Sequence, residues 1–373
     1  MLLIEADGKA LFAEQGIPVP AAILATDVVP PLPGDGPWIV KAQVPVGGRG
    51  KAGGIIRCIS RAEVETAVDG MLGTRLKGHD IDACLVESAV AGQERYLSIM
   101  VDPASYGLRV IYSIQGGVEI ENSGSAQGRM CAPHPGAVTE ALAELLVDEP
   151  DAWRSQVAAI GKALANLVQE RELALAEINP LFVSSAGCVA GDAKVVIDLN
   201  AIHRQPGIAA IIAARPRTYA DACRKIAEGF DYVELDPDGE IGLVTTGAGL
   251  SMMLIDELTA RGAKPLNFCD IRTGQMRGSP ERLIRVLQWI TARSSLKAIL
   301  VNIFAGITDL GEFAALLAAA IRASPSLRVP VVARLVGHNA AEARRILLEA
   351  QPGMLVTEDL EEALARIGTV VRT

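Results

Sequence analysis

The chain has 373 residues, which is too long for one ordinary hydrophobic core and indicates two domains. Half of the residues are hydrophobic and only 4% are aromatic, so we expect a globular protein whose core consists of Ala, Val, Leu and Ile, as in parallel α/β sheets. The formal net charge of −9 disfavours extensive binding of nucleic acid but allows a local basic site.

The N-terminal segment and the cysteines predict a cytoplasmic protein. The chain begins MLLIEADGKALF and has neither the basic region nor the apolar stretch of a signal peptide. No run of about 18 apolar residues follows, so no membrane span is expected. The six cysteines are far apart and form no C-x-x-C pair or zinc pattern, which favours reduced thiols.

The first 234 residues combine helices and short strands in a pattern that indicates an α+β domain. The segment from Glu5 predicts a short amphipathic helix that stops at Gly16. Further helices are expected at 61–76 and, as two stretches, over 136–171. Apolar and alternating runs predict strands at 38–44, 54–60, 83–90, 94–102, 107–114, 174–183 and 188–198.

The pattern changes near residue 235, where strands begin to alternate strictly with helices. The expected strands are 240–246, 264–271, 298–304 and 330–337, followed by a closing segment from Leu355. Helices are expected at 251–262 and from Pro280, Asp309 and Asn339. This alternation predicts a doubly wound parallel sheet. The stretch DPDG (236–239) is the expected linker, which gives domains 1–234 and 235–373.

The glycine-rich stretch VPVGGRGKAGG (44–54) is the most unusual segment of the first domain. It contains G-x-G-x-x-G, but a strand follows it, whereas a Rossmann turn opens a helix. A phosphate loop of the Walker A type is also excluded, because Pro45 and Ala52 replace the required Gly and Ser/Thr. Two interpretations remain. The stretch is either a mobile lid whose Arg49, Lys51 and backbone amides bind phosphate, or a solvent-exposed loop without a ligand.

Three polar residues predict a magnesium site. Glu177 and Asn179 lie two apart in a strand and therefore point to one face. Asp192 lies on the next expected strand, across a short turn, and can reach the same face. One carboxylate and one amide oxygen suffice for Mg²⁺, which completes its octahedron with water and phosphate. The alternative interpretation is the exposed polar face of an edge hairpin.

Further charged residues fit the same kind of site. Lys41 is the one charge in the apolar strand WIVKAQV and must either extend to solvent or meet an anion. Glu87 and Glu94 flank a short connection between two strands, where carboxylates can accept hydrogen bonds from a nucleoside. Two ordinary surface acids are the alternative. Together these residues match a nucleoside triphosphate with Mg²⁺.

The sequence that carries these residues resembles the nucleotide-binding β subunits of ADP-forming acid–CoA ligases, a family typified by succinate–CoA ligase and malate–CoA ligase. The resemblance runs nearly end to end. It rests on VKAQVPVGGRGKAGG (40–54), LVE (85–87), GGVEIE (116–121), LALAEINPL (173–181), HRQPG (203–207), TTGAGL (245–250), LVNIFAGI (300–307) and RLVGHNA (334–340).

The resemblance implies an ATP-grasp domain over 1–234 and a flavodoxin-like CoA-ligase domain over 235–373. It implies ATP phosphates at Lys41 and at Gly48, Arg49 and Gly50, the nucleoside at Glu87 and Glu94, and Mg²⁺ at Asn179 and Asp192. Glu177 is expected to orient a phosphorylated histidine of a partner α subunit, which also binds most of the CoA. The acid is expected at Thr246 and at Gly306, Ile307 and Thr308, near the start of a helix.

The second domain departs from the family pattern. Thr246 replaces an asparagine, and the turn DIRTG (270–274) replaces the glycines of DVGGG. Thr308 and Asp309 stand where the family has a residue followed by a basic one, and the stretch after GGVEIE is short and rich in Gly and Ser. We therefore hypothesise that Arg272 helps to bind the distal anionic group of a non-standard acid, such as a hydroxy-dicarboxylate or a sulfonated acid. A solvent-facing Arg272 is the alternative.

Three functions remain open from the sequence. The first is a catalytic subunit acting on succinate, malate or another anionic acid. The second is a non-catalytic nucleotide-binding regulatory paralogue, and the third is an ATP-grasp ligase that acts without CoA. Among the four histidines, His338 lies in GHNA, which superficially resembles a phosphohistidine motif, but its place in the chain indicates a structural loop. The sequence leaves open ATP against GTP and the αβ against α2β2 assembly.

Overall fold

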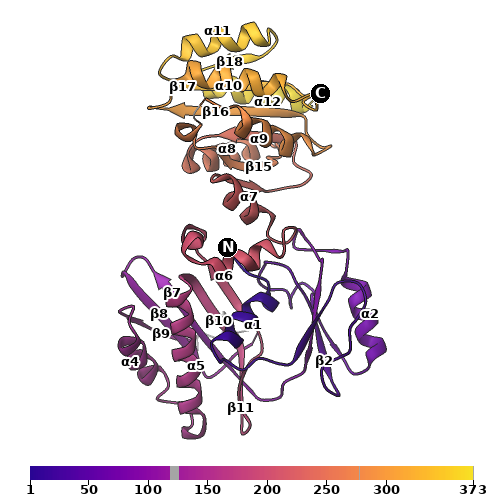
Figure 1. Cartoon of the computed structure of the whole chain (residues 1–373), viewed down its shortest axis with the longest axis vertical. Coiled ribbons are helices and arrows are strands. Elements are labelled where there is room, and N and C mark those ends of the chain that lie inside the picture. Colours follow the sequence, from indigo (N-terminus) through magenta and orange to yellow (C-terminus); the bar gives the residue numbers. More distant parts are fainter. Residues whose placement is uncertain (118–125, 277, 373) are drawn as a thin grey trace. The chain divides into compact units, whose positions relative to one another are not determined.

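The computed structural model describes residues 1–117, 126–276 and 278–372 (Figure 1). The chain divides into two compact units, Met1–Tyr219 and Ala220–Thr373. Part of the GGVEIE motif and of the Gly/Ser-rich stretch after it lies outside the described residues. No helix in the described part of the chain is long and apolar enough to cross a membrane.

The first unit contains a four-stranded antiparallel sheet. Its strands run in the order β1 (Ala22–Ala25), β6 (Cys84–Ser88), β2 (Trp38–Ala42) and β3 (Ile55–Cys58). Helix α2 (Arg61–Met71) lies beside this sheet in Figure 1. Its apolar side chains recur at helical spacing and are buried, as an amphipathic helix requires: Val64, Ala67, Val68 and Met71. The helix ends earlier than expected, and the short strands β4 (Arg75–Leu76) and β5 (His79–Asp80) follow.

A second, larger sheet completes the first unit. Its strands run in the order β11 (Gly187–Ala190), β10 (Leu173–Ser184), β7 (Gln93–Asp102), β8 (Gly107–Ser113) and β9 (Gln127–Cys131). Strand β12 (Lys194–Ile197) pairs with the first half of β10. Figure 1 shows α4 (Pro135–Leu145) and α5 (Asp151–Glu170) against this sheet. The unit ends with η1 (Leu199–Arg204) and α6 (Pro206–Ala213).

The expected single strand 188–198 is wrong, because it is interrupted after β11. Gly191 lies so close to Phe182 that an added Cβ would be 2.4 Å from its ring, and the chain leaves the sheet at this point. Asp192 therefore lies in the gap between β11 and β12 and not on a strand. The direction of its side chain is therefore not set by the alternation of side chains along a strand.

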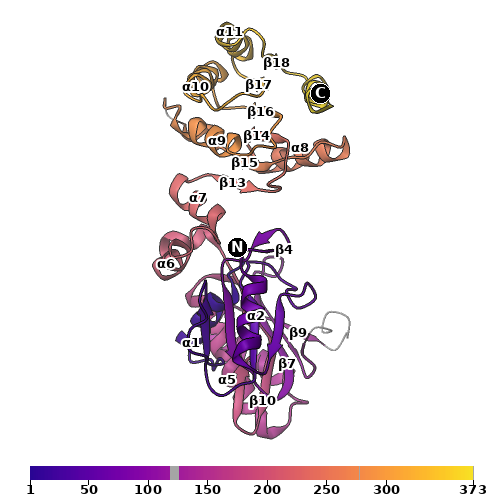
Figure 2. The ribbon, with the colours of Figure 1, turned by 90° about the vertical axis from the view of Figure 1, so that its right-hand side faces the viewer.

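The second unit contains a four-stranded parallel sheet in the order β14 (Ile241–Thr245), β16 (Ala298–Ala305), β17 (Val331–Gly337) and β18 (Leu355–Thr357). Helices α9 (Glu281–Thr291), α10 (Leu310–Arg322) and α11 (Ala340–Ala350) cover one face (Figure 2). Helices α8 (Ala248–Ala260) and α12 (Leu360–Arg372) cover the other. Helices on both faces confirm the expected doubly wound arrangement.

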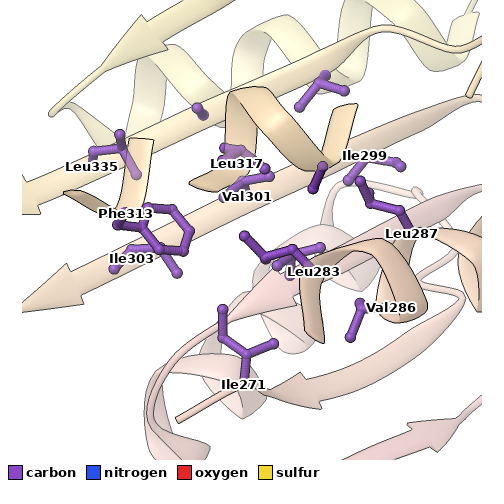
Figure 3. Packing of buried hydrophobic residues seen from close by; sticks show 14 of the residues in the cluster. Ile271, Leu283, Val286, Leu287, Ile299, Val301, Ile303, Phe313, Leu317 and Leu335 are labelled. Carbon is purple, nitrogen blue, oxygen red and sulfur yellow. The ribbon is translucent and has the colours of Figure 1, made fainter. Parts of the chain in front are cut away.

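The core of this unit consists mainly of aliphatic side chains from the sheet and its helices, with the aromatic ring of Phe313 among them (Figure 3). Leu283 of α9 and Leu317 of α10 pack with Val301 and Ile303 of β16, and all four are fully buried. Burial on both faces of the sheet explains why every residue of β16 except Asn302 is apolar.

The division between the units lies before the predicted boundary at residues 234 and 235. Helix α7 (Ala220–Glu228) and strand β13 (Asp231–Glu234) belong to the second unit, because β13 pairs antiparallel with β15 (Asn267–Asp270). The DPDG stretch is a turn inside this unit, in which the Gly239 amide donates to the Asp236 carbonyl over 3.0 Å. Strand β15 was expected in the parallel sheet, but it pairs with β13 in a separate two-stranded sheet. Its buried Asn267 side chain accepts from the Leu243 amide and donates to the Leu243 carbonyl of β14, each over 2.9 Å.

Candidate functional site

One cavity of about 1140 Å³ in the first unit brings the predicted nucleotide and metal residues together. These residues come from β2, the glycine-rich hairpin, β6, β7, β10 and the gap before β12. All nine line the cavity: Lys41, Gly48, Arg49, Gly50, Glu87, Glu94, Glu177, Asn179 and Asp192. A volume of this size is sufficient for a nucleotide-sized ligand.

The glycine-rich hairpin joins the antiparallel strands β2 and β3, as predicted. Gly48 has a φ of +69°, a conformation that L side chains rarely adopt. The Arg49 side chain turns inward and is buried, with Nη2 at 2.6 Å from Glu5 Oε2 and 3.0 Å from Asp192 Oδ1. Lys51 is exposed on the same loop. The interpretation of an entirely solvent-exposed loop is therefore wrong for Arg49.

Lys41 on β2 is buried and meets anions, which decides between its two predicted environments. Its Nζ donates to Glu5 Oε1 over 2.7 Å and to the Gly191 carbonyl over 2.7 Å, and lies 2.8 Å from Glu87 Oε2. An ammonium group has three hydrogens, so these three acceptors match its full donor capacity. Burial lowers the pKa of Lys41, but Glu5, Glu87 and Asp192 outweigh this effect and hold the pKa above its usual value.

Two residues of α1 (Glu5–Glu14) join this site and were missed by the sequence analysis. Glu5 is completely buried and Lys9 nearly so. Lys9 Nζ lies 2.8 Å from Glu5 Oε1 and also donates to Glu87 and to the Gly191 carbonyl. Burial raises the pKa of Glu5, but Lys41, Lys9 and Arg49 together hold it well below its usual range. The available signal was Glu5 and Lys9 at i and i+4 beside the apolar residues that start the chain.

Six charged side chains therefore form one network of ion pairs, and all of them except Lys9 line the cavity. Three are acids and three are bases, so the network is neutral as a whole. Its members are Glu5, Lys9, Lys41, Arg49, Glu87 and Asp192. Buried charges are tolerated only when they are paired in this way.

The acid–amide face of β10 lies on the same cavity. Glu177 accepts a hydrogen bond from the Tyr96 hydroxyl over 2.9 Å and lies 3.5 Å from Lys194. Asn179 Oδ1 accepts from the Gly117 amide over 2.7 Å. Asp192 is partly exposed, and burial together with Glu5 raises its pKa. One carboxylate and one amide oxygen on a single cavity wall are the donor set that Mg²⁺ takes with water and phosphate, so the residues fit this ion.

The remaining predicted residues lie in the second unit, in loops at the carboxyl ends of parallel strands. Thr246 follows β14, and Gly306, Ile307 and Thr308 follow β16. The Thr308 hydroxyl lies 2.9 Å from the hydroxyl of Thr273, which in turn lies 3.5 Å from that of Thr246. Ligands of open α/β sheets bind at this edge.

Two further residues of these loops have structural roles. The Asp309 side chain caps α10 by accepting a hydrogen bond from the Gly311 amide over 2.8 Å. This cap gives a structural reason for an aspartate at the position where the family has a basic residue. His338 is exposed in the loop after β17, and its carbonyl accepts from the Leu310 amide over 3.1 Å. That position matches the structural loop that the sequence predicted.

Arg272 has a left-handed backbone with φ of +50°, in the turn after β15. Its guanidinium lies 2.9 Å from Asp231 Oδ2, and Lys225 holds the other oxygen of that carboxylate at 2.7 Å. The Arg272 side chain is 41% exposed. Arg272 is therefore not a purely solvent-facing side chain, because its guanidinium pairs with Asp231 of the same unit.

The fold and the site define the class of this protein as an ATP-grasp ligase with a CoA-ligase domain. The family model of the ATP-grasp domain matches residues 2–183, and that of the CoA-ligase domain matches residues 244–370. The β subunit of ADP-forming succinate–CoA ligase from Xanthomonas campestris pv. campestris is 33% identical over 99% of this chain and 98% of its own length. The corresponding subunit from Chloroflexus aurantiacus is 36% identical over 98% of both chains. The chain belongs to the family of β subunits of ADP-forming succinate–CoA ligases.

A solved structure supports the same fold. The ATP citrate lyase of Methanothrix soehngenii, determined with citrate and coenzyme A, superimposes with a TM-score of 0.74. It covers 100% of this chain and 99% of its own, at 16% sequence identity. At that identity the likeness shows the fold alone.

Proposed function

We propose that this chain is the nucleotide-binding β subunit of a cytoplasmic, ADP-forming acid–CoA ligase that works with a CoA-binding α subunit. ATP transfers its γ-phosphoryl group to a histidine nitrogen of the partner, and ADP leaves. The acid carboxylate takes the phosphoryl group from the histidine and becomes an acyl phosphate. The CoA thiol then attacks the acyl carbon, and phosphate leaves.

The observation that carries this proposal is the single cavity lined by all nine predicted nucleotide and metal residues. In it, Lys41 and the segment 48–50 bind the phosphates, whereas Glu87 and Glu94 accept hydrogen bonds from the nucleoside. Phosphoryl transfer depends on positioning and on charge stabilisation, which fixed cations in a recessed site supply. Glu177, held by Tyr96, orients the partner's phosphohistidine.

Asn179 and Asp192 hold Mg²⁺ in this proposal. When bound, Mg²⁺ neutralises phosphate charge and orients the phosphoryl group. The chain's own contribution is to hold the two oxygen ligands on one wall, with Asn179 oriented by Gly117. Such fixed ligands reduce the reorganisation that accompanies binding.

The loops at the carboxyl ends of β14, β15 and β16 bind the acid. Thr246, Thr308 and the backbone at Gly306 and Ile307 supply neutral hydrogen-bonding groups, and Arg272 supplies charge when it leaves Asp231. This set suits an anionic acid with additional polar groups, such as a hydroxy-dicarboxylate or a sulfonated acid, besides succinate.

A direct assay tests the function. The full-length chain, co-purified with its α subunit, is supplied with ATP, Mg²⁺, CoA and a panel of succinate, malate and sulfonated acids. We expect ADP release that requires both CoA and one of these acids. ADP release that is independent of CoA would favour a ligase of another kind, and nucleotide binding without turnover on any acid would favour the regulatory paralogue.

A further inference from the structure

The N-terminal helix α1 places a completely buried carboxylate between Lys41 and Arg49, two buried cations that line the nucleotide site. Glu5 Oε1 is 2.7 Å from Lys41 Nζ, and Glu5 Oε2 is 2.6 Å from Arg49 Nη2. Each carboxylate oxygen therefore pairs with one of these two cations. Lys9, one turn along α1, supports this arrangement by pairing with Oε1 at 2.8 Å.

Two other carboxylates, Glu87 and Asp192, also pair with these cations. They differ from Glu5 because the proposed function assigns a ligand to each of them, the nucleoside to Glu87 and Mg²⁺ to Asp192. Glu87 pairs with Lys41 and also faces the predicted nucleoside position. Asp192 pairs with Arg49, is 31% exposed, and is a predicted Mg²⁺ ligand. Because Lys41 already uses all three of its hydrogens, a phosphate must replace one of its acceptors. When Glu87 and Asp192 turn to the ligand, Glu5 is the carboxylate that both cations keep.

We propose that Glu5 is a positioning residue of the nucleotide site, which holds Lys41 and Arg49 side by side for the phosphates. The proposal rests on the proposed function, because it requires that the cavity bind a nucleotide. Two cations held close together repel each other, and a shared anion fixes their separation. An ion pair between a helix glutamate and a strand lysine has the same task in protein kinases, an unrelated class of phosphoryl-transfer enzymes.

Helix α1 also provides a matched control. Asp7 is buried on the same helix, where both of its oxygens accept from Arg215 at 2.9 Å and one accepts from the Tyr219 hydroxyl at 2.6 Å. It is not one of the residues that line the cavity. Glu5→Gln and Asp7→Asn therefore each neutralise one buried acid of α1, but only the first variant alters the nucleotide site.

The test is calorimetric titration of the full-length chain with ADP and Mg²⁺. We expect Glu5→Gln to raise the Kd for ADP about tenfold, because the glutamine oxygen accepts from one cation while its NH2 group faces the other. Asp7→Asn should change the Kd less than about twofold, although both variants lower the melting temperature. In steady-state assays, Glu5→Gln should raise the KM for ATP and leave the KM for the acid unchanged.

Four outcomes would overturn the inference or its basis. An unchanged Kd in Glu5→Gln would make Glu5 a purely structural residue, and a lower Kd would make it a competitor of the phosphates. If Glu5→Gln does not fold, Glu5→Asp keeps the charge but is one methylene too short to hold both cations, and its Kd should rise about threefold; an unchanged Kd there also overturns the inference. A wild-type chain that does not bind ADP would instead refute the proposed function.

Discussion

The two units build their candidate sites from different chemistry. In the first unit, three acids and three bases form a neutral network of ion pairs, and most of these side chains are buried. In the second unit, hydroxyl and backbone groups gather at the ends of parallel strands, and Ile307 in one of these loops is fully exposed.

This difference determines how each site responds to substitution. Removing one member of a buried ion-pair network leaves another charge unpaired, which is costly, so the members depend on one another. A half-buried hydroxyl in a loop, such as that of Thr246 or Thr308, can be exchanged at less cost to the fold. We therefore expect the first unit to determine whether the enzyme is active and the second unit to determine which acid it uses.

The largest expected effect is that of Lys41→Ala, which tests the first half of this comparison. It removes a phosphate cation and leaves Glu5 and Glu87 with Lys9 as the lysine that still pairs with both of them. We expect kcat/KM for ATP to fall by about 10²–10³, the usual loss for a preorganised group that stabilises developing charge.

The control for this variant is Lys162→Ala, which removes an exposed lysine of α5. It should leave kcat/KM within about twofold of the wild type, as is usual for surface substitutions. Lys41→Ala with more than about a tenth of the wild-type kcat/KM would show that the phosphates bind elsewhere.

Much of the first site was predictable from the sequence, because its residues stand out locally. Lys41 is the one charge in an apolar strand, and Glu177 and Asn179 share a face through the period of two. Glu5 and Lys9 could not be assigned, since a charged residue on a short helix is ordinarily exposed. Their burial depends on partners far along the chain, in β2, β6 and the gap at Gly191.

Neither the division between the units nor the pairing of Arg272 with Asp231 could be predicted from the sequence, and the physical reason is the same for both. Residues 231–234 join the second unit through pairing with β15, more than 30 residues later. Asp231 becomes the partner of Arg272 only through this pairing. Local patterns predict elements, whereas contacts between distant elements require the folded chain.

Asp192→Asn probes the metal half of the first site. Asn keeps an oxygen ligand but loses the charge that attracts a divalent cation. We expect the Mg²⁺ concentration for half-maximal ADP binding to rise about tenfold, the value of one charge-assisted interaction. Asp198→Asn, at an exposed cap of η1, is the control and should leave the Mg²⁺ requirement unchanged. Unaltered Mg²⁺ dependence in Asp192→Asn would reduce Asp192 to a counter-ion of Arg49.

A paired substitution in the second unit tests the other half of the comparison. Arg272→Ala should raise the KM for the acid about threefold, because a partly exposed charge contributes little. Asp231→Asn releases the same guanidinium and should lower this KM, while the KM for ATP stays constant in both variants. If neither variant alters the KM for any acid in the panel, Arg272 has no part in acid binding.

The smallest expected effect is a pH dependence of the free energy of unfolding, which distinguishes Glu5 from a carboxylate with an ordinary pKa. Its three cationic neighbours hold the pKa of Glu5 below its usual value in the folded chain, although burial opposes them. A lowered folded pKa stabilises the fold above the unfolded pKa of about 4.3, and this contribution disappears as the pH falls below it. The difference in free energy of unfolding between wild type and Glu5→Gln should therefore be constant between about pH 7 and 6 and shrink below about pH 5. Urea unfolding at each pH measures it, and a difference that grows toward acid would mean that the folded pKa is raised and that the cations do not hold Glu5 as a carboxylate.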